Sequence, residues 1–308
     1  MKALVTGGAG FIGSHLVDSL VERGYTIRVI DNLSTGKLSK IASLLKSKNV
    51  DFIEGDIRDS ETAKKCIHGI DAVYHLAATT SVPFSLKNPE LTYDTNVTGT
   101  LNLLTQCAEQ KVSKFIFSSS CAVYGEPMNL PINEKHPTNP ISPYAESKLE
   151  GEQHCLNFHK KQRLKAVVLR LFNVYGTRQG LNEYSGVITQ FINRARKRLP
   201  LIIYGDGSQT RDFVHVRDVV EAILSATEIE RAEGKVFNIG SGKPTSIQKL
   251  AQTISELYEN KLEILHDEPR LGDIKQSYAE IAKAAEILNY MPQVSLKDGL
   301  CQLIEESS

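Results

Sequence analysis

The sequence predicts an α/β fold, a doubly wound parallel sheet with a smaller C-terminal α/β substrate-binding domain, on three observations. Six short apolar runs alternate with helical stretches, which is the pattern of parallel strands joined by crossover helices. A glycine-rich turn follows the first run, and an acidic residue ends the second. After Leu171, loop-forming and polar residues become more frequent. The expected strands are residues 2–6, 26–30, 51–53, 72–76, 115–118 and 166–171.

The chain of 308 residues is long enough for two domains with cores of their own. We expect residues 1–172, joined again by about 213–240, to form a nucleotide-binding domain. About 173–212 and 241–308 are expected to form the substrate-binding domain.

Composition excludes several classes of protein. The 36 Lys and Arg residues balance 36 Asp and Glu residues, so no basic surface predicts a nucleic-acid partner. No apolar run approaches the roughly 18 residues that a membrane span needs. The five cysteines are odd in number and form no CxxC pair, which speaks against disulfides and a zinc site. We therefore expect a cytoplasmic protein with reduced thiols, no bound metal, and no nucleic-acid or membrane partner.

The turn at residues 7–13 fits two glycine spacings that end at Gly13. Glycines there permit a tight turn and a close approach of the backbone to a pyrophosphate, which the N-terminus of the next helix attracts. An ordinary strand–helix turn is the alternative. The strand before, the helix after, and Asp31 at 18 residues past Gly13 favour dinucleotide binding of the Rossmann type. The turn residues expected to bind the dinucleotide are Gly7, Gly10, Phe11, Ile12 and Gly13.

Asp31 also indicates which dinucleotide binds. Its carboxylate can accept hydrogen bonds from both ribose hydroxyls, and its charge repels a 2′-phosphate. Asn32 rather than an arginine follows it. The expected cofactor is therefore NAD rather than NADP.

Further candidates follow the later strands, whose carboxyl ends form the edge where ligands of such sheets bind. Asp56 can meet the adenine amino group, or it can cap the next helix. His75 is expected only to pack or to form hydrogen bonds, whereas the small residues after it let a cofactor lie close. Ser120 is a candidate for orienting a substrate hydroxyl, although a serine run is otherwise an ordinary turn. The other expected cofactor contacts at this edge are Leu76, Ala77, Ala78 and Ser118.

Tyr144 and Lys148 lie four residues apart in a helix expected to run to about Lys161, behind Ser142 as N-cap and Pro143 at the first position. Residues i and i+4 share a helix face, so the phenol and the ammonium can reach one site. A unit charge ~4 Å away contributes about 4 kcal/mol at an effective dielectric of about 20. Lys148 can therefore lower the pKa of Tyr144 towards neutrality and make it a general base. A half-buried Tyr beside a solvated Lys is the alternative.

The part of the chain after Leu171 offers candidates for a pyrophosphate-bearing ligand. Asn173, Arg211 and Arg270 are the expected side chains, because arginine binds phosphate in a bidentate manner. Surface salt bridges are the alternative for each arginine. Residues 213–227 are expected as a helix, and 236–240 as a strand that returns to the large sheet. The stretches rich in loop formers are residues 172–176, 180–186, 204–212 and 268–273.

Taken together, these residues resemble the extended short-chain dehydrogenase/reductase family, and within it the UDP-sugar 4-epimerases. The similarity covers nearly the whole chain through ordered motifs at residues 6–13, 31–36, 75–78, 96–100, 211–215 and 290–292. It implies that Ser120, Tyr144 and Lys148 are the catalytic residues and that two copies associate through helices around 91–110 and 144–161. It adds as cofactor contacts Asn32, Ser34, Thr35, Gly36, Asp56, Ile57, Asn96, Tyr144 and Lys148. It adds as substrate contacts Ser81, Val82, Ser120, Tyr144, Val187, Tyr204, Gln209, Asp273 and Ser277.

One position separates subtypes within this resemblance. The related 4,6-dehydratases carry acid/base groups after the catalytic hydroxyl, and the decarboxylases carry Glu, whereas this chain has Cys121 and Ala122. The resemblance therefore implies epimerisation: Tyr144 takes the proton of the C4 hydroxyl, hydride passes to a tightly bound NAD, and the 4-keto sugar turns and takes the hydride back. A 4-ketoreductase that releases its cofactor is the alternative enzyme, and an NAD-binding relative without turnover is the alternative outside catalysis.

The resemblance also bears on the sugar. In such epimerases, a tyrosine four residues after the acid matching Asp273 restricts the pocket to plain hexoses, and a small residue admits a 2-N-acetyl group. This chain has Ser277 there, with Tyr278 beside it. The expected pair is therefore UDP-GlcNAc and UDP-GalNAc. A shift of one residue would place Tyr278 at this position and favour UDP-glucose and UDP-galactose.

Overall fold

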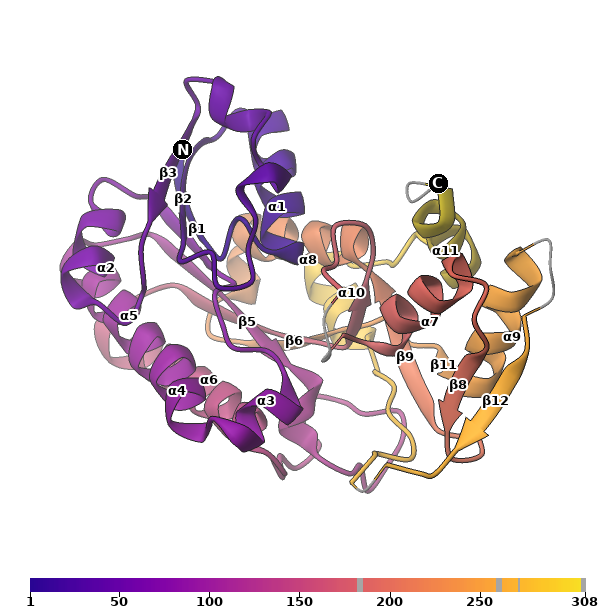
Figure 1. Cartoon of the computed structure of the whole chain (residues 1–308). Helices are drawn as coiled ribbons and strands as arrows, with labels where there is room; N and C mark the ends of the chain where they lie inside the picture. Colours follow the sequence, from indigo (N-terminus) through magenta and orange to yellow (C-terminus); the bar gives the residue numbers. More distant parts are fainter. Residues whose placement is uncertain (182–184, 259–261, 271, 306–308) are drawn as a thin grey trace.

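A seven-stranded sheet forms the centre of the protein in a computed structural model that describes residues 1–181, 185–258, 262–270 and 272–305 (Figure 1). The strand order is β10-β6-β5-β4-β1-β2-β3, and every neighbouring pair is parallel. This is the predicted doubly wound sheet, and its order reverses at β1, where β4 and β2 flank the same strand. The strands are β1 (Lys2–Thr6), β2 (Thr26–Asp31), β3 (Val50–Glu54), β4 (Ala72–His75), β5 (Lys114–Ser120), β6 (Ala166–Leu171) and β10 (Val236–Ile239).

Helices cover both faces of this sheet because successive strand residues point to opposite sides. In β1, Ala3 and Val5 enter one apolar cluster and Leu4 enters the other. The first face packs against α1 (Phe11–Glu22), α8 (Val216–Glu228) and α10 (Ala282–Leu288). The second packs against α2 (Ser60–Ile67), α5 (Gly99–Glu109) and α6 (Pro143–Gln162). The short helices α3 (Val82–Lys87) and α4 (Pro89–Tyr93) lead through a π-helical turn at Asp94–Thr98 into α5.

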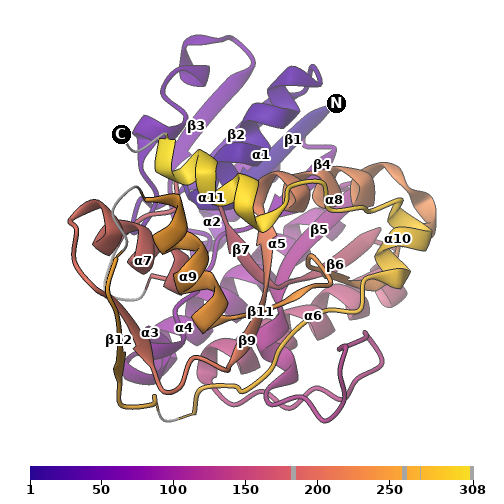
Figure 2. The same cartoon turned by 90° about the vertical axis from the view of Figure 1, so that its right-hand side faces the viewer.

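A smaller lobe lies beyond the carboxyl ends of the central strands (Figures 1 and 2). It holds a three-stranded sheet of β7 (Asn173–Tyr175), β9 (Thr210–His215) and β11 (Pro244–Ser246). A parallel pair is formed by β8 (Leu201–Tyr204) and β12 (Ile264–Asp267). Its helices are α7 (Val187–Arg196), α9 (Ile247–Leu257) and α11 (Leu296–Glu305), and the three share a separate apolar core with β8 and β9.

The start of one helix differs from the sequence analysis. The predicted helix at 213–227 begins only at Val216, because Phe213 and Val214 are buried and pair with β7. His215 then caps α8, its Nδ1 accepting the N–H of Arg217 at 3.3 Å.

The boundary between the two predicted domains is crossed by one helix. α10 lies in the stretch 241–308 that we expected in the smaller domain, yet its residues Ala284 and Leu288 pack in the core of the large sheet. The predicted loop at 180–186 lies partly outside the described residues, as does one residue of the 268–273 stretch. Within the described part of the chain, none of the helices combines the length and apolar character that crossing a bilayer demands.

Candidate active site

The glycine turn between β1 and α1 has the shape of a phosphate cradle. Gly7 has φ +69°, and a Cβ there would lie 2.9 Å from the backbone nitrogen of Ala77. The N-cap of α1 is Gly10, and the first turn of the helix carries no acidic side chain. The N–H groups at this helix end therefore have no side-chain acceptor of their own, which suits a pyrophosphate. The predicted contacts Phe11 and Ile12 stand half-buried at the start of the helix.

Asp31 closes β2 beside this turn. Its carboxylate accepts the N–H of Ala9 at 3.0 Å and that of Leu33 at 2.9 Å. Burial raises the pKa of Asp31, and these two bonds lower it in part. Since a carboxylate has about four acceptor positions, two remain for ribose hydroxyls. A Cβ on Gly36 would lie 2.6 Å from Asp31 Oδ1, so a glycine is required where the following loop folds back.

The neighbouring predicted contacts are bonded among themselves. Asn32 donates from Nδ2 to Asp56 at 2.9 Å and accepts the N–H of Ser34 at 3.1 Å. Asp56 also accepts from the Arg58 guanidinium at 2.9 and 3.0 Å, and this arginine lowers its pKa to about 2. The alternative role of Asp56 as a helix cap is wrong, because the cap of α2 is Asp59. The remaining predicted contacts Thr35 and Ile57 are exposed and buried, respectively.

A chain of buried hydrogen bonds crosses the edge of the sheet at the reversal point. His75 Nδ1 lies 2.8 Å from Thr6 Oγ1, and its Nε2 lies 2.8 Å from Thr100 Oγ1. Thr6 Oγ1 also accepts the N–H groups of Leu76 and Ala77 at 3.1 Å. Burial lowers the pKa of His75 to about 3, so the ring is neutral. His75 is thus the packing and hydrogen-bonding residue that the sequence predicted, and it fixes the strand ends that precede Ala78.

Asn96 sits within the π-helical turn and is 1% exposed. Its Oδ1 accepts from Thr79 N at 2.8 Å, and its Nδ2 donates to Thr79 O and to Ser147 Oγ, both at 2.9 Å. This side chain, predicted as a cofactor contact, therefore ties the loop after β4 to the helix that carries Lys148. A π-helical turn is often found at functional sites, because it re-aims one side chain.

Tyr144 and Lys148 lie in the first two turns of α6. The predicted start of this helix is confirmed: Ser142 Oγ accepts the N–H of Ala145 at 3.2 Å, and Pro143 occupies the first turn. The two side chains are 9% and 5% exposed, respectively, and the Lys148 ammonium lies 4.5 Å from the ring centroid of Phe117.

Ser120 joins this pair from the end of β5. Its Oγ accepts the N–H of Ala122 at 3.1 Å, and its hydroxyl is hydrogen-bonded to that of Tyr144. The structure therefore brings Ser120, Tyr144 and Lys148 together. Ser118 is half-buried two residues earlier on the same strand.

The pKa of Tyr144 is not lowered in this structure, contrary to the expectation from the sequence. Burial raises the pKa of Tyr144 to about 12, against the lowering effect of the Ser120 hydrogen bond. Burial also lowers the pKa of Lys148 to about 8. Burial is the largest cause of both shifts, and the spacing of the two residues along the helix did not reveal its cost.

The arginines of the smaller lobe behave differently from one another. Arg211 forms an ion pair with Asp273 and donates to the carbonyl of Ile274 at 2.6 Å, so the salt-bridge alternative is realised for it. Arg270 is exposed, and its guanidinium lies 3.9 Å from the ring centroid of Tyr204. The Arg270 guanidinium is thus exposed to solvent and lies over the Tyr204 ring.

The other predicted substrate contacts lie on several elements. Gln209 donates from Nε2 to the carbonyl of Tyr204 at 2.8 Å, and Asn173 is exposed at the start of β7. Val187 is the first residue of α7. Ser81 caps α3, its Oγ accepting the N–H of Phe84 at 3.1 Å, and Val82 follows with 38% of its surface exposed.

Ser277 is on an extended segment that crosses between the two lobes. Gln276 pairs with Thr210, and Ala279 pairs with Ile132. Alternate residues of an extended segment face the same side, so Ser277 shares the face of Ala279, and Tyr278 has the opposite one. Ala279 is buried in a cluster with Val123 and Phe172, next to the end of β5. Ser277 is 6% exposed on that inner face.

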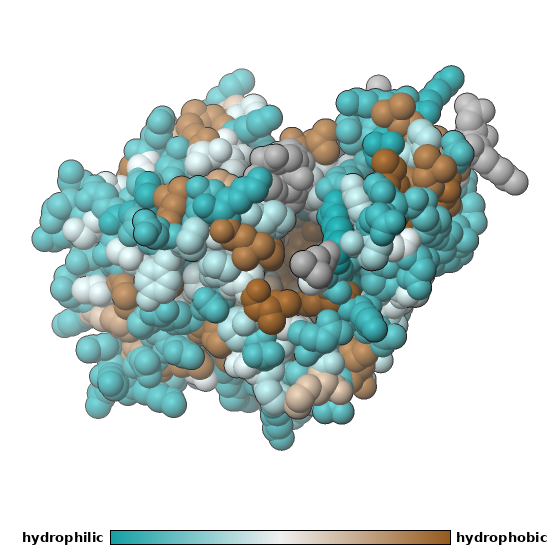
Figure 3. Space-filling model, turned by 60° about the horizontal axis from the view of Figure 1, so that its bottom comes forward, coloured by the Kyte–Doolittle hydropathy of each residue, from teal (hydrophilic) through white to brown (hydrophobic). Residues whose placement is uncertain are grey.

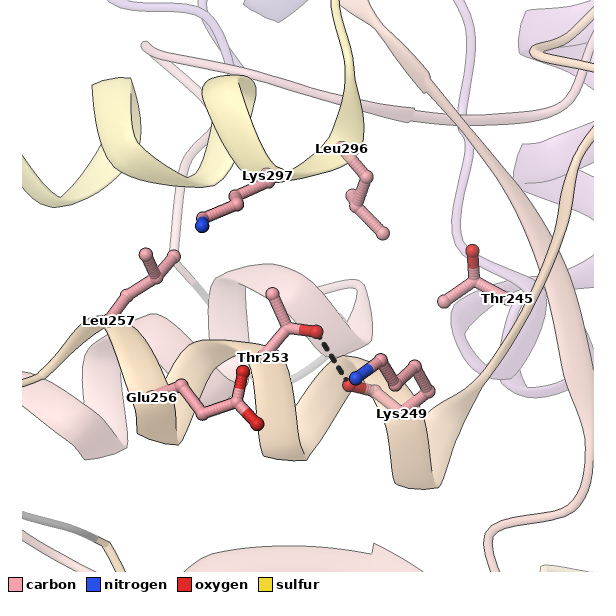
Figure 4. A pocket seen from close by; sticks show the side chains of 7 residues that line it. All are labelled: Thr245, Lys249, Thr253, Glu256, Leu257, Leu296 and Lys297. Atoms are coloured by element: carbon pink, nitrogen blue, oxygen red, sulfur yellow. Dashed lines mark hydrogen bonds between the residues drawn. The ribbon is translucent and has the colours of Figure 1, made fainter.

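A hollow lies between the larger part and the smaller lobe, and hydrophobic side chains line its walls (Figure 3). Two cavities are found elsewhere on the smaller lobe. One of about 410 Å³ separates α9 from α11 and contains none of the predicted site residues (Figure 4). The other, of about 190 Å³, lies between the 176–181 loop, α7 and the end of α11. Neither of these two cavities therefore coincides with the predicted site residues.

Two buried acids near the site were missed by the sequence analysis. Asp212, fully buried, accepts the N–H and hydroxyl of Ser241 at 2.6 Å and the N–H groups of Gly242 and Ala279 at 3.0 Å. Glu152 is 2% exposed on α6 and pairs with Arg170. The sequence did contain two indications of the Glu152–Arg170 pair. Glu152 lies one helical turn after Lys148, and Arg170 interrupts the apolar run of β6.

Comparison with known proteins identifies the class. The NAD dependent epimerase/dehydratase family matches residues 3–240. A Methanocaldococcus jannaschii protein, provisionally named a UDP-glucose 4-epimerase, is 41% identical over 303 residues, which is 98% of this chain and 96% of that protein. The structure of a UDP-glucose 4-epimerase from Thermotoga maritima with UDP-glucose superposes with a TM-score of 0.94 at 40% identity, covering 99% of this chain and 98% of that one. The UDP-N-acetylglucosamine 4-epimerase of Methanobrevibacter ruminantium does so with a TM-score of 0.93 at 35% identity and the same coverage.

The fold and the glycine cradle thus define an NAD-binding enzyme of the Rossmann type. The chain belongs to the NAD dependent epimerase/dehydratase family. The predicted family, fold class and cofactor are confirmed.

Proposed function

We propose that the chain inverts C4 of UDP-N-acetylhexosamines, interconverting UDP-GlcNAc and UDP-GalNAc. The chain is an NAD-dependent UDP-sugar 4-epimerase, the activity for which several of its relatives are named. The choice among sugars rests on one observation. The inner face of the 276–280 segment carries Ser277, and the bulky Tyr278 stands on the opposite face.

The proposed roles in the reaction follow from the site. NAD, when bound, would supply the acceptor and donor of the hydride at C4. Tyr144 removes the proton of the C4 hydroxyl and gives it back, and the Ser120 hydroxyl orients that group. Lys148, with a pKa of about 8, is mostly protonated at neutral pH, so its charge favours the phenolate of Tyr144.

The rest of the proposed site holds the ligands in place. The glycine cradle would bind the pyrophosphate of NAD at the N-terminus of α1. The Asp31 carboxylate would accept hydrogen bonds from the ribose hydroxyls of NAD. Arg270 and Asn173 hold the diphosphate of the sugar nucleotide, whereas Arg211 is held by Asp273, so the sugar can turn while the nucleotide stays bound. The division into a nucleotide-binding part (1–172 and 213–240) and a sugar-nucleotide part (173–212 and 241–308) belongs to this proposal, with α10 packed on the former.

The plain hexose pair is the second candidate, because the relatives named above include UDP-glucose 4-epimerases at 40 and 41% identity. The test is incubation of the purified protein with UDP-GlcNAc and, separately, UDP-glucose, without added cofactor, followed by anion-exchange separation of the products. Formation of UDP-GalNAc with little UDP-galactose is the expected result. UDP-galactose alone would contradict the proposed sugar, and neither product from protein with bound NAD would favour a ketoreductase.

We also propose that two copies associate through the helices around 91–110 and 144–161. Leu86 and Leu91 are 63% and 40% exposed on α3 and α4. Tyr93, 48% exposed, donates its hydroxyl to Glu150 of α6 at 2.6 Å. Apolar side chains at this density on one helical surface are typical of a contact with another protein surface. Light scattering on the eluting protein should give twice the chain mass of 34.1 kDa, and a monomer would contradict the proposal.

A further inference from the structure

We propose that Glu152 is a positioning residue, which locks α6 in one register against the carboxyl ends of β5 and β6 through Arg170 and Ser119. The inference rests on the roles proposed above for Ser120, Tyr144 and Lys148. It goes beyond them by naming the buried groups that hold those three side chains in relation to one another.

The Glu152 carboxylate binds two strands at once. Arg170 donates from Nε to Oε1 at 2.9 Å and from Nη2 to Oε2 at 2.6 Å, an arrangement in which the two planar groups face each other. Ser119 donates its hydroxyl to Oε1 at 2.5 Å. The side chains of Arg170 and Glu152 are only 7% and 3% exposed. Water therefore cannot replace these bonds without a rearrangement of the core.

The bonds join the elements that carry the proposed catalytic residues. Ser119 and Arg170 are direct partners in the register of β5 and β6. Ser119 immediately precedes Ser120. On α6, Glu152 lies one helical turn after Lys148 and two turns after Tyr144, so the three residues share a face. A single carboxylate thus connects the strand that presents the serine with the helix that presents the tyrosine and the lysine.

Directional bonds at this point fix both the rotation and the axial position of α6. A slip of one residue moves a helix by about 1.5 Å and turns it by about 100°. Apolar packing tolerates small shifts better than two charge-assisted hydrogen bonds with a defined plane do. A misplacement of about 1 Å at a reacting group can cost a factor of about 100 in rate.

Glu152 also acts on the charge of Lys148. The groups around this ammonium are the Phe117 ring of β5, His75 of β4, and Cys155 and Glu152 of α6. His75 is neutral, and burial raises the pKa of the Cys155 thiol well above its ordinary value. Glu152 is therefore the anion among them, and it opposes the effect of burial on Lys148. Burial alone would lower the pKa of Arg170, but its hydrogen bonds to the Glu152 carboxylate raise it.

A role in stability alone is a weaker explanation of this pair. Buried ion pairs can often be replaced by apolar side chains of similar volume without loss of stability, whereas removal of one partner leaves a charge stranded. Glu152→Met/Arg170→Met is therefore the informative variant, because it keeps an apolar core and removes the three bonds. Ser119→Ala is the milder variant, because it leaves the ion pair intact and cuts only the link to β5.

The other end of β5 supplies a matched control. Lys114 Nζ lies 2.9 Å from Glu233 Oε1, with side-chain exposures of 10% and 18%. Lys114→Met/Glu233→Met thus removes an ion pair of the same strand, away from the proposed catalytic residues. Tyr144→Phe completes the set as a test of the proposed function itself.

The experiment measures bound NAD, the melting temperature, kcat, KM and the pH dependence of kcat for each holoenzyme. We expect Glu152→Met/Arg170→Met to fold with NAD and to lose at least about tenfold in kcat with little change in KM. We expect the alkaline limb of its kcat profile to move to lower pH, because Glu152 raises the pKa of Lys148 and Arg170 is not among the groups that shift it. A purely structural role would not cause this movement. Ser119→Ala should lose about threefold in kcat without moving that limb, and the control should match the original protein in both.

An unchanged kcat in a folded Glu152→Met/Arg170→Met variant would overturn the inference. If that variant does not fold, Ser119→Ala becomes the test. A kcat of Ser119→Ala equal to that of the original protein would then overturn the inference. Tyr144→Phe separates this result from a failure of the proposed function. An active Tyr144→Phe variant refutes the catalytic roles. If Tyr144→Phe is inactive and Glu152→Met/Arg170→Met is fully active, only the positioning role is refuted.

Discussion

The two sides of the candidate site are built in different ways. On the sheet side, His75 and Glu152 are buried, and hydrogen bonds occupy both nitrogens of the one and both oxygens of the other. On the side of the smaller lobe, Asn173 is exposed at the start of β7, and Arg270 is exposed in the loop after β12. The proposed proton and hydride transfer thus depends on buried residues, and the proposed binding of the sugar nucleotide depends on exposed residues. Substitutions on the two sides should therefore affect different kinetic constants.

The largest effect is expected from Tyr144→Phe on the sheet side. Loss of the hydroxyl removes the proposed general base, a contribution of about 10²–10⁴ in rate. We expect kcat to fall by that factor while NAD remains bound, because the phenyl ring of the substituted phenylalanine still fills the buried position. Turnover assays with UDP-GlcNAc and an ultraviolet spectrum of released NAD check both points. Near-normal turnover would contradict the mechanism.

A tenfold to hundredfold effect on selectivity is expected from Ser277→Tyr on the segment between the lobes. A tyrosine on the inner face would occupy the space proposed for the 2-N-acetyl group, and steric discrimination of this kind is worth about 1–3 kcal/mol. The ratio of kcat/KM for UDP-GlcNAc to that for UDP-glucose should fall accordingly. Tyr278→Ser is the matched control, because its side chain faces the other way. A larger change of the ratio in the control would assign the gate to Tyr278.

A smaller effect is expected from Arg270→Ala on the smaller lobe. This guanidinium is exposed and screened by solvent, so its loss should raise KM by about fivefold to tenfold, with kcat nearly unchanged. Lys at this position keeps the charge but not the planar stacking on Tyr204, so it should restore only part of the affinity. An equal loss in kcat would show that this side of the site also takes part in the chemistry, and the contrast between the two sides would fail.

The last effect concerns stability rather than activity, and it comes from the neutral ring of His75. Its folded pKa of about 3 lies below the ordinary value of 6.5, so the unfolded chain binds a proton that the folded chain does not. The resulting stabilisation is complete above pH 6.5 and is lost as the pH falls towards 3, by up to about 1.4 kcal/mol per pH unit. His75→Gln should be less stable at pH 7 but should depend less on pH. Urea denaturation at pH 7, 6 and 5 compares the two proteins, and parallel curves would contradict the buried neutral ring.

Much of the sheet side could be predicted, because its signals are local. The apolar runs predicted β1 and β6 to the residue, and the glycine spacing with Asp31 predicted the cradle and the cofactor. The N-cap and first turn of α6 were predicted from Ser142 and Pro143. These features depend on neighbouring residues, so periodicity and cap chemistry determine them.

The remainder depends on distant pairings that a single sequence does not display. Arg170 inside an apolar run looks like an interruption until Glu152, 18 residues away, is seen to pair with it. The raised pKa of Tyr144 follows from burial by several elements, which spacing along one helix cannot show. Asp56 looked like a helix cap, but the turn extends to Asp59 before α2 begins.

The bonds of Asp212 have a consequence for a cleaved chain. Residues 265–270 are all exposed, so a protease such as trypsin, which cleaves after arginine, can reach the Arg270 side chain. Three contacts hold the fragment beyond Arg270. Asp212 accepts the N–H of Ala279, and Ala279 also pairs with Ile132. The Tyr290 hydroxyl donates to the Gly240 carbonyl at 2.8 Å. A chain cut there should therefore migrate as one particle in a native gel and separate into two pieces only in detergent.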